Sequence, residues 1–262
     1  MSTRPTAIEA LAANPSTAGL VLDFDGVLSP IVDDPTTSAM PDLVVPILSR
    51  LAKSLGLLAV MSGRPVDFLV DRVRVPGIQL LGSYGIEQVR QDGRCQMDPD
   101  AEAWLGKVRE AAEALDERLR GTPGIRVEKK SVSVAVHWRQ APDHEAAADK
   151  VRLLVGQIAA ETGLRIEPGK LVEELRPPID VDKGSAITAL LAAERPTTIA
   201  YAGDDLGDIP ALRAVRDAGG YALVVDHGPE TDSRVLELAD QTYSGTEDFA
   251  DWLAELADAI GA

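Results

Sequence analysis

Apolar runs of strand length alternate with helical patterns along the first 85 residues of the chain. Consecutive apolar residues are typical of a buried strand, and apolar positions three and four residues apart are typical of a helix. By these criteria strands are predicted at 18–23, 56–61 and 78–82, and helices at 6–13, 41–54 and 65–73. Pro65 suits the first position of its helix, whereas Pro46 weakens the prediction around it or implies a kink. The alternation predicts a parallel sheet with helices on both faces.

The pattern changes between residues 86 and 172. Asp92-Gly93 predicts a hairpin turn, and valines alternate with mainly polar residues from Ser131 to Arg139. Such alternation is typical of an antiparallel sheet with one packed and one exposed face. Strands are predicted at 86–90, 94–97, 125–129, 131–138 and 164–167, and helices at 99–120 and 143–161. We interpret this region as an inserted α+β domain.

Strand and helix patterns alternate again after residue 172. The predicted strands are 197–202 and 221–225, and the predicted helices are 183–193, 208–216 and 246–260. The fold class is therefore predicted to be α/β, with a doubly wound parallel sheet core at 1–85 and 173–262 and an inserted α+β domain at 86–172.

Composition limits the partners of such a protein. The 262 residues, 45% of them hydrophobic, suffice for a large core and a smaller insert. The formal net charge of −16 argues against a nucleic-acid partner, which needs a basic face. No stretch has the length of a membrane span or the apolar centre of a signal peptide, so we expect no membrane partner and a cytoplasmic location. The single cysteine, Cys95, excludes an intrachain disulfide and fits a reducing compartment.

Two carboxylates stand where the first apolar strand ends. Asp23 and Asp25 flank Phe24 and precede Gly26. In open α/β sheets the carboxyl ends of the strands border the ligand crevice, and two acids placed there repel each other unless a cation lies between them. Oxygen ligands suit Mg²⁺. The arrangement suggests a nucleophilic carboxylate assisted by a metal ion, and the alternative is an ordinary turn after a strand.

Three further segments carry polar side chains where a strand ends or a helix begins. Residues 62–64 read Ser-Gly-Arg after an apolar run, and their hydroxyl and amide groups could meet a phosphate oxygen. Lys183 opens a helix, where the helix dipole already favours anions. Asp204, Asp205 and Asp208 form an acidic cluster after another apolar run. Taken singly, the three segments could be a common turn, a solvated lysine and a solvated acidic turn.

In their order along the chain, these four segments resemble the active-site loops of the haloacid dehalogenase superfamily of phosphotransferases. The resemblance implies that Asp23 is the nucleophile and that Asp25 is the general acid and base. Ser62 and Lys183 would bind the phosphoryl group, and the lysine would also neutralise the nucleophile. Arg64 is expected to bind substrate.

The same resemblance assigns a Mg²⁺ site. Asp23, the backbone carbonyl of Asp25 and Asp204 would bind the ion, and Asp208 would support them from behind. Asp205 could do either or orient a water. All of these groups are expected to gather around one cation at one edge of the sheet.

Three segments narrow the resemblance to the trehalose-6-phosphate phosphatase family. They are 22–32, 128–139 and 169–177, and with the four loops they extend the resemblance over 20–215. The inserted domain would then be a C2-type cap, which closes over the active site. The residues expected to contact the disaccharide are Glu128, Lys130, Arg139, Lys170 and Glu174. Carboxylates accept hydrogen bonds from sugar hydroxyls and cations donate them, although each residue could also be a surface charge on a half-exposed sheet.

The sequence departs from the family pattern in two places. The family usually has Gly-x-His-Gly where residues 82–85 read Gly-Ser-Tyr-Gly, and Gly207 and Ile209 replace a threonine and a glutamate of the fourth loop. The expected metal ligands are retained, so these changes bear on how the sugar is held.

The resemblance implies a Mg²⁺-dependent phosphatase that releases trehalose and phosphate from trehalose 6-phosphate through an aspartyl-phosphate. Functional coupling to a trehalose-6-phosphate synthase is the partnership it suggests. Two alternatives stay open. One is a phosphatase of another sugar phosphate, such as sucrose, glucosylglycerol or mannosylglycerate phosphate. The other is a non-catalytic, phosphosugar-binding regulator.

Overall fold

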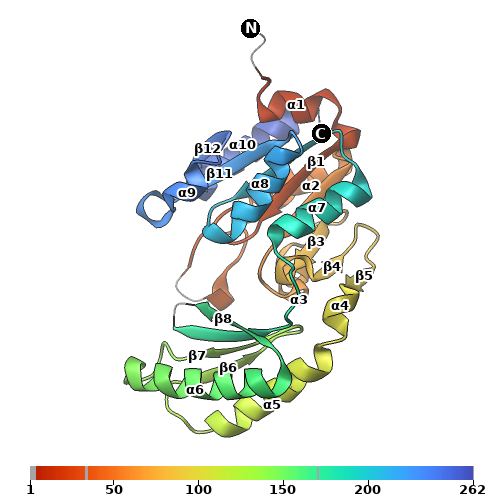
Figure 1. Ribbon diagram of the computed structural model, residues 1–262. Helices are drawn as coiled ribbons and strands as arrows, with labels where there is room; N and C mark the ends of the chain where they lie inside the picture. The colour runs from red at the N-terminus through yellow and green to blue at the C-terminus, as the bar shows by residue number, and fades with distance from the viewer. Residues whose placement is uncertain (1–3, 33–34, 170, 262) are drawn as a thin grey trace. The chain divides into compact units, whose positions relative to one another are not determined.

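The computed structural model describes residues 4–32, 35–169 and 171–261, which form two compact units (Figure 1). Unit 1 comprises Met1–Gln96 and Val181–Ala262, and unit 2 comprises Met97–Asp180. This division differs from the insert expected at 86–172 at both ends.

Unit 1 is built on an eight-stranded sheet in the order β12-β11-β10-β1-β2-β3-β4-β5. Its strands are β1 (Ala18–Asp23), β2 (Leu57–Met61), β3 (Gln79–Gly82), β4 (Glu87–Val89), β5 (Cys95–Met97), β10 (Thr198–Gly203), β11 (Tyr221–Asp226) and β12 (Gln241–Ser244). The six strands from β12 to β3 are parallel, and β4 pairs antiparallel with β3. The α/β fold class and the parallel core predicted from the sequence are confirmed.

Helices cover both faces of this sheet (Figure 1). They are α1 (Ala7–Ala13), α2 (Val44–Ser54), α3 (Val66–Arg72), α7 (Lys183–Glu194), α8 (Ile209–Asp217), α9 (Ser233–Leu236) and α10 (Gly245–Ile260). Alternate residues of β1 point to opposite faces: Leu20 and Leu22 pack with α1, α2 and α10, whereas Val21 packs with α7 and α8. Every residue of β1 and β2 is buried, as expected of strands covered on both faces.

Unit 2 contains a four-stranded antiparallel sheet in the order β6-β7-β9-β8. Its elements are α4 (Pro99–Glu102), α5 (Leu105–Leu119), β6 (Arg126–Lys129), β7 (Val134–His137), α6 (His144–Thr162), β8 (Arg165–Gly169) and β9 (Val172–Arg176). Val134 and Val136 pack with Leu115 of α5 and Val151 of α6. One face of the sheet therefore carries the core, and the other presents polar side chains.

Several of the described elements differ from the sequence-based expectations, among them the short helix α9, which was not predicted. The helix expected at 99–120 is divided into α4 and α5, with Trp104 preceding α5. Strand β9 was not predicted and extends unit 2 beyond residue 172, and β12 was not predicted either. Pro46 lies in the first turn of α2, where its missing N–H breaks no helical hydrogen bond, and α2 continues to Ser54.

Among the described residues, no helix is both long enough and apolar enough to cross a membrane.

Candidate active site

The carboxyl ends of three neighbouring parallel strands bring the predicted catalytic segments of unit 1 together. Asp23 is the last residue of β1 and lies opposite Met61 of β2, so Ser62 follows at the same edge. On the other side of β1, Leu22 pairs with Ala202 of β10, and Asp204 follows that strand. Segments far apart in sequence therefore reach one edge because their strands are in register.

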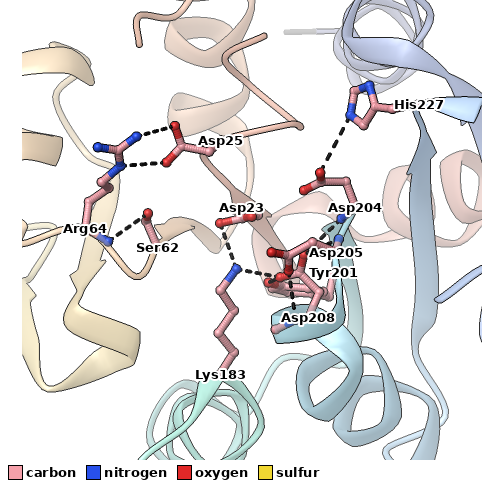
Figure 2. Close-up of polar contacts among 11 residues, drawn as sticks. Asp23, Asp25, Ser62, Arg64, Lys183, Tyr201, Asp204, Asp205, Asp208 and His227 are labelled. Carbon is pink, nitrogen blue, oxygen red and sulfur yellow. Dashed lines mark hydrogen bonds and ion pairs between the residues drawn. The ribbon is translucent and has the colours of Figure 1, made fainter. Parts of the chain in front are cut away.

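Lys183 connects two of the carboxylates at this edge. Its Nζ lies 2.9 Å from Oδ1 of Asp23 and 2.6 Å from Oδ1 of Asp208, and all three side chains are buried (Figure 2). Lys183 is the first residue of α7, which Asp182 caps through a hydrogen bond from the Ser185 amide. The cap fixes the start of the helix and therefore the direction of the lysine.

Asp208 accepts hydrogen bonds on both carboxylate oxygens. Oδ1 accepts from Lys183 and, at 2.5 Å, from the hydroxyl of Tyr201, while Oδ2 accepts from the amides of Asp204 (2.9 Å) and Asp205 (3.1 Å). These bonds fix the turn that carries Asp204. The structure thus places Asp208 behind Asp204 as a support. Tyr201, in the middle of β10, was not singled out from the sequence.

The acidic groups perturb one another. Burial raises the pKa of Asp23 well above its usual value, Lys183 lowers it, and Asp208 and Asp204 raise it further. Burial and the charges of Asp208 and Asp205 raise the pKa of Asp204 to about 8. Burial would lower the pKa of Lys183, but Asp208 and Asp23 raise it well above its usual value, so the lysine is charged. The single positive charge of Lys183 is thus surrounded by several carboxyl groups.

This donor set fits a magnesium ion. Carboxylate oxygens of Asp23, Asp204 and Asp208 lie within 4.8 Å of one another, all three residues are buried, and hard oxygen ligands are what Mg²⁺ prefers. A divalent cation would also relieve the repulsion that raises the pKa of Asp204. Because the oxygens of Asp208 are already hydrogen-bonded, Asp23 and Asp204 are the side chains better placed to bind the ion.

Asp25 is held by a different set of partners. Arg64 binds its carboxylate through two hydrogen bonds (Figure 2). The Ser38 hydroxyl donates a third at 2.7 Å. Arg64, expected to bind substrate, is therefore engaged with Asp25 in this structure. Ser62 is buried, and its Oγ accepts a hydrogen bond of 3.1 Å from the Arg64 amide.

His227 joins the site from a strand that the sequence analysis did not connect with it. It follows β11, and its Nε2 donates to the Gly26 carbonyl at 2.8 Å and lies 3.7 Å from Oδ2 of Asp204. Gly26 has a φ of +80°, and a Cβ built there would lie 2.1 Å from that Oδ2. Its position directly after a predicted parallel strand is the feature of the sequence that could have identified His227.

The five residues expected to contact sugar all fall within the range of unit 2. On the exposed face of its sheet, Oε1 of Glu174 accepts hydrogen bonds from Lys130 (2.9 Å) and the Ser133 hydroxyl (2.5 Å). Glu128 pairs with His137, which lies 2.7 Å away. The hydrogen bond from His137 lowers the pKa of Glu128 to about 2, against the opposing effect of burial. Glu128 is thus held as a charged acceptor.

Arg139 and Lys170 are the remaining predicted sugar contacts. Arg139 is exposed in the turn after β7, beyond the last strand residue, and its carbonyl accepts a hydrogen bond from His144. Lys170 lies outside the described residues.

Comparisons with known proteins agree with this geometry. Residues 21–242 match the family model described as trehalose-phosphatase. A trehalose-phosphate phosphatase of Mycobacterium ulcerans is 34% identical over 247 residues, which cover 91% of this chain and 62% of that protein. One of Mycobacterium avium is 36% identical over 226 residues, covering 82% of this chain and 56% of that protein. The chain thus spans less than two thirds of the length of these curated relatives.

Solved structures share the fold. A trehalose-6-phosphate phosphatase related protein superposes with a TM-score of 0.76 at 23% identity, covering 92% of this chain and 97% of that one. The C-terminal domain of a Candida albicans trehalose synthase regulatory protein gives 0.66 at 16% identity, covering 97% and 98%. At these identities the likeness concerns the fold, but the family model extends over most of the sequence. The chain therefore belongs to the trehalose-phosphatase family.

Proposed function

We propose that this protein is a Mg²⁺-dependent phosphatase that hydrolyses trehalose 6-phosphate to trehalose and phosphate. One observation carries the proposal: buried Asp23 lies within 2.9 Å of Lys183 and beside Asp204 and Asp208, inside the segment that matches the trehalose-phosphatase family. The curated relatives named trehalose-phosphate phosphatase support the choice of substrate.

In the first step, an Asp23 oxygen attacks phosphorus, and the bond from phosphorus to the sugar oxygen breaks. Asp25, protonated at this stage, gives its proton to the leaving oxygen, so trehalose departs as a neutral alcohol. The phosphoryl group remains on Asp23 as an aspartyl-phosphate. Lys183 and the residues around Ser62 hold the phosphoryl oxygens and stabilise the charge that develops on them.

In the second step, water attacks the same phosphorus. Asp25, now a carboxylate, takes a proton from the water, and the bond from phosphorus to the Asp23 oxygen breaks. Phosphate leaves and both aspartates return to their first state. Asp23, the Asp25 carbonyl and Asp204 would hold the metal ion, with Asp208 orienting the turn behind them. Mg²⁺ bound there supplies positive charge that neutralises the phosphoryl oxygens during both displacements.

Unit 2 is the proposed source of sugar specificity. Its exposed sheet face presents carboxylate acceptors and ammonium donors, which are the groups that bind vicinal hydroxyls. We assign sugar contacts to Lys130 and Glu174, which bind each other, and to Glu128, which binds His137. Arg139 and Lys170 are assigned the same role. A cytoplasmic location and coupling to a trehalose-6-phosphate synthase complete the proposal, since such an enzyme needs a source of its phosphorylated disaccharide.

A phosphate-release assay tests the proposed reaction. The purified chain is incubated with trehalose 6-phosphate and with sucrose, glucosylglycerol and mannosylglycerate phosphates, with Mg²⁺ and with EDTA. We expect Mg²⁺-dependent release and the highest kcat/KM for trehalose 6-phosphate. A clear preference for another sugar phosphate would contradict the substrate, and release unaffected by EDTA would contradict the cofactor.

Asp23→Asn distinguishes an enzyme from a regulator that shares the fold. The variant keeps the shape of the side chain but removes the nucleophile, so it should lose turnover while still binding substrate. The solved regulatory protein with this fold makes the control relevant. Turnover that survives the substitution would contradict the role of Asp23, and wild-type protein that binds the phosphosugar without cleaving it would favour a regulator.

A further inference from the structure

Two consecutive residues of unit 1 hold a backbone conformation that side chains rarely adopt. Ser83 has a φ of 50° and Tyr84 a φ of 62°, directly after β3. Non-glycine residues in this left-handed region are uncommon, and they persist where surrounding contacts determine the conformation. Such positions are often found at functional sites. We call residues 82–85 the corner, and the residues that it contacts indicate its role.

Hydrogen bonds tie the corner to the segment that begins at Ser62. The Ser83 amide donates to the Arg64 carbonyl at 2.7 Å, and the Tyr84 amide donates to the Ser62 carbonyl at 2.9 Å. The buried Ser83 hydroxyl donates to Glu87 at 2.6 Å, and the same carboxylate oxygen accepts from the Val66 amide at 3.4 Å. The corner therefore binds the start and the middle of the 62–66 segment, and Glu87 connects it with the end.

Side chains pack against the corner on both sides. A Cβ built on Gly63 would lie 2.7 Å from Cζ and 2.8 Å from the hydroxyl oxygen of Tyr84, so the tyrosine ring rests against the Gly63 backbone. On the other side, a Cβ on Gly85 would lie 2.6 Å from Cβ of Ala186, in the first turn of α7. The corner thus lies between the Ser62 segment and the helix that begins with Lys183.

We propose that the ring of Tyr84 is a positioning element that holds the Ser62–Gly63–Arg64 backbone at the distance from Lys183 at which both contact a phosphoryl group. Tyr84 acts through Gly63, and the strained corner gives the ring its direction. This inference rests on the proposed phosphatase site, and it adds the residue that sets the spacing of two phosphate-binding segments. Small displacements of such segments reduce rates steeply.

Three variants test the proposal. Tyr84→Asn removes the ring but suits the left-handed backbone, because asparagine tolerates that conformation. Tyr84→Phe keeps the ring. Gly63→Ala introduces the methyl group that collides with the ring, and the double variant Gly63→Ala/Tyr84→Asn vacates the space for it. For each, we would measure the Kd for inorganic phosphate by calorimetry in the presence of Mg²⁺, kcat and KM with trehalose 6-phosphate, and Tm.

We expect Tyr84→Asn and Gly63→Ala each to weaken phosphate binding and to lower kcat/KM by about tenfold or more. Tyr84→Phe should stay within about threefold of the wild type, well short of that loss. The double variant should be impaired less than the product of the single losses, because the collision is gone. Arg195→Asn is the matched control: it changes the left-handed residue at the other end of α7 (φ of 48°), and phosphate binding should be unchanged.

Three results would overturn the proposal. They are a folded Tyr84→Asn variant with wild-type phosphate affinity and turnover, equal losses in Tyr84→Phe and Tyr84→Asn, and strictly multiplicative losses in the double variant. If Tyr84→Asn does not fold, wild-type affinity in Gly63→Ala overturns it. Wild-type protein that binds phosphate without hydrolysing the sugar phosphate contradicts the proposed function alone, and the phosphate Kd values still decide the role of Tyr84. Wild-type protein that neither binds nor hydrolyses contradicts both.

Discussion

Arg64 binds the carboxylate of Asp25 through two hydrogen bonds, from Nε to Oδ2 at 2.9 Å and from Nη2 to Oδ1 at 3.0 Å. A planar guanidinium that meets a carboxylate in this way fixes the orientation of that carboxylate. The guanidinium also lies over the Phe68 ring, 4.8 Å from its centroid. Asp25, the proposed general acid and base, is therefore oriented by Arg64, which the sequence analysis had suggested as a substrate ligand.

Arg64→Lys tests this relationship. Lysine keeps the charge but cannot form the paired hydrogen bonds, so the proton donor loses its direction. We expect kcat for trehalose 6-phosphate to fall about tenfold, within the contribution of general acid–base catalysis, while KM changes little. A rise in KM with kcat unchanged would show instead that Arg64 binds substrate in the ground state. Arg74→Lys, at an exposed position nearby in sequence, is the control and should retain both constants.

Gly26→Ala should block the proposed metal site. The added Cβ would lie 2.1 Å from the Asp204 carboxylate, and the φ of +80° opposes any side chain. We expect loss of measurable Mg²⁺ binding by calorimetry together with loss of turnover. Gly93→Ala provides the matched control, because Gly93 has the same φ of +80° but nothing within 4 Å of its built Cβ. That control should lose about 1 kcal/mol of stability and keep its Mg²⁺ affinity.

Mg²⁺ binding should strengthen as pH rises towards 8. The pKa of Asp204 is raised to about 8, so below that pH the metal-free protein holds a proton that the ion must displace. Calorimetry at pH 6, 7 and 8 in buffers of different ionisation enthalpy would measure both affinity and proton release. An affinity independent of pH, with no proton released at pH 6, would contradict the ionisation assigned to Asp204.

The same shift has a consequence for the metal-free protein. A carboxyl whose pKa is higher in the folded than in the unfolded state stabilises the fold most at low pH, and this contribution disappears as pH rises through the folded-state value. The Asp204 contribution to the free energy of unfolding should therefore decrease between about pH 4 and pH 8 in EDTA. Comparison of wild type with Asp204→Asn over this range isolates it, because the variant lacks the group.

Glu174→Ala should separate sugar recognition from phosphoryl transfer. It removes the acceptor that binds Lys130 and Ser133, and loss of one charged hydrogen-bonding group costs about 1.5–3 kcal/mol. We expect kcat/KM to fall accordingly for trehalose 6-phosphate and to stay near the wild-type value for an aryl phosphate. Equal losses on both substrates would mean that this face does not bind the sugar. Glu161→Ala, in an exposed ion pair of α6, should alter neither.

Local sequence sufficed for the parts of the site that stand directly after apolar strands. Asp23 and Asp204 end or follow fully buried runs, and parallel strands bring such positions to one edge, so their proximity could be predicted. The pairing of Arg64 with Asp25 could not be predicted, because it depends on the paths of the two loops that carry these residues. Tyr201 was missed because a buried aromatic in a strand reads as core until its hydroxyl partner is known.

Local sequence patterns also failed to predict two strands, β9 of unit 2 and β12 of unit 1. Strand β9 reads Val-Glu-Glu-Leu-Arg, with adjacent glutamates on opposite faces, and one of them, Glu173, is buried against the core with Arg152 as its partner. A buried charge interrupts the alternation that identifies a strand. Strand β12 is short and polar because it lies at the sheet edge, so it gives a weak signal.

The four hydrogen bonds to Asp208 have a thermodynamic consequence for the whole protein. Because they lock the acidic turn in place, folding itself must assemble like charges that an open chain would keep apart. Mg²⁺ bound at the turn would relieve this repulsion between carboxylates. The affinity for Mg²⁺ and the free energy of unfolding of the metal-free protein are therefore linked. A substitution that loosens Asp208 should therefore reduce the repulsion in the metal-free fold and also weaken Mg²⁺ binding.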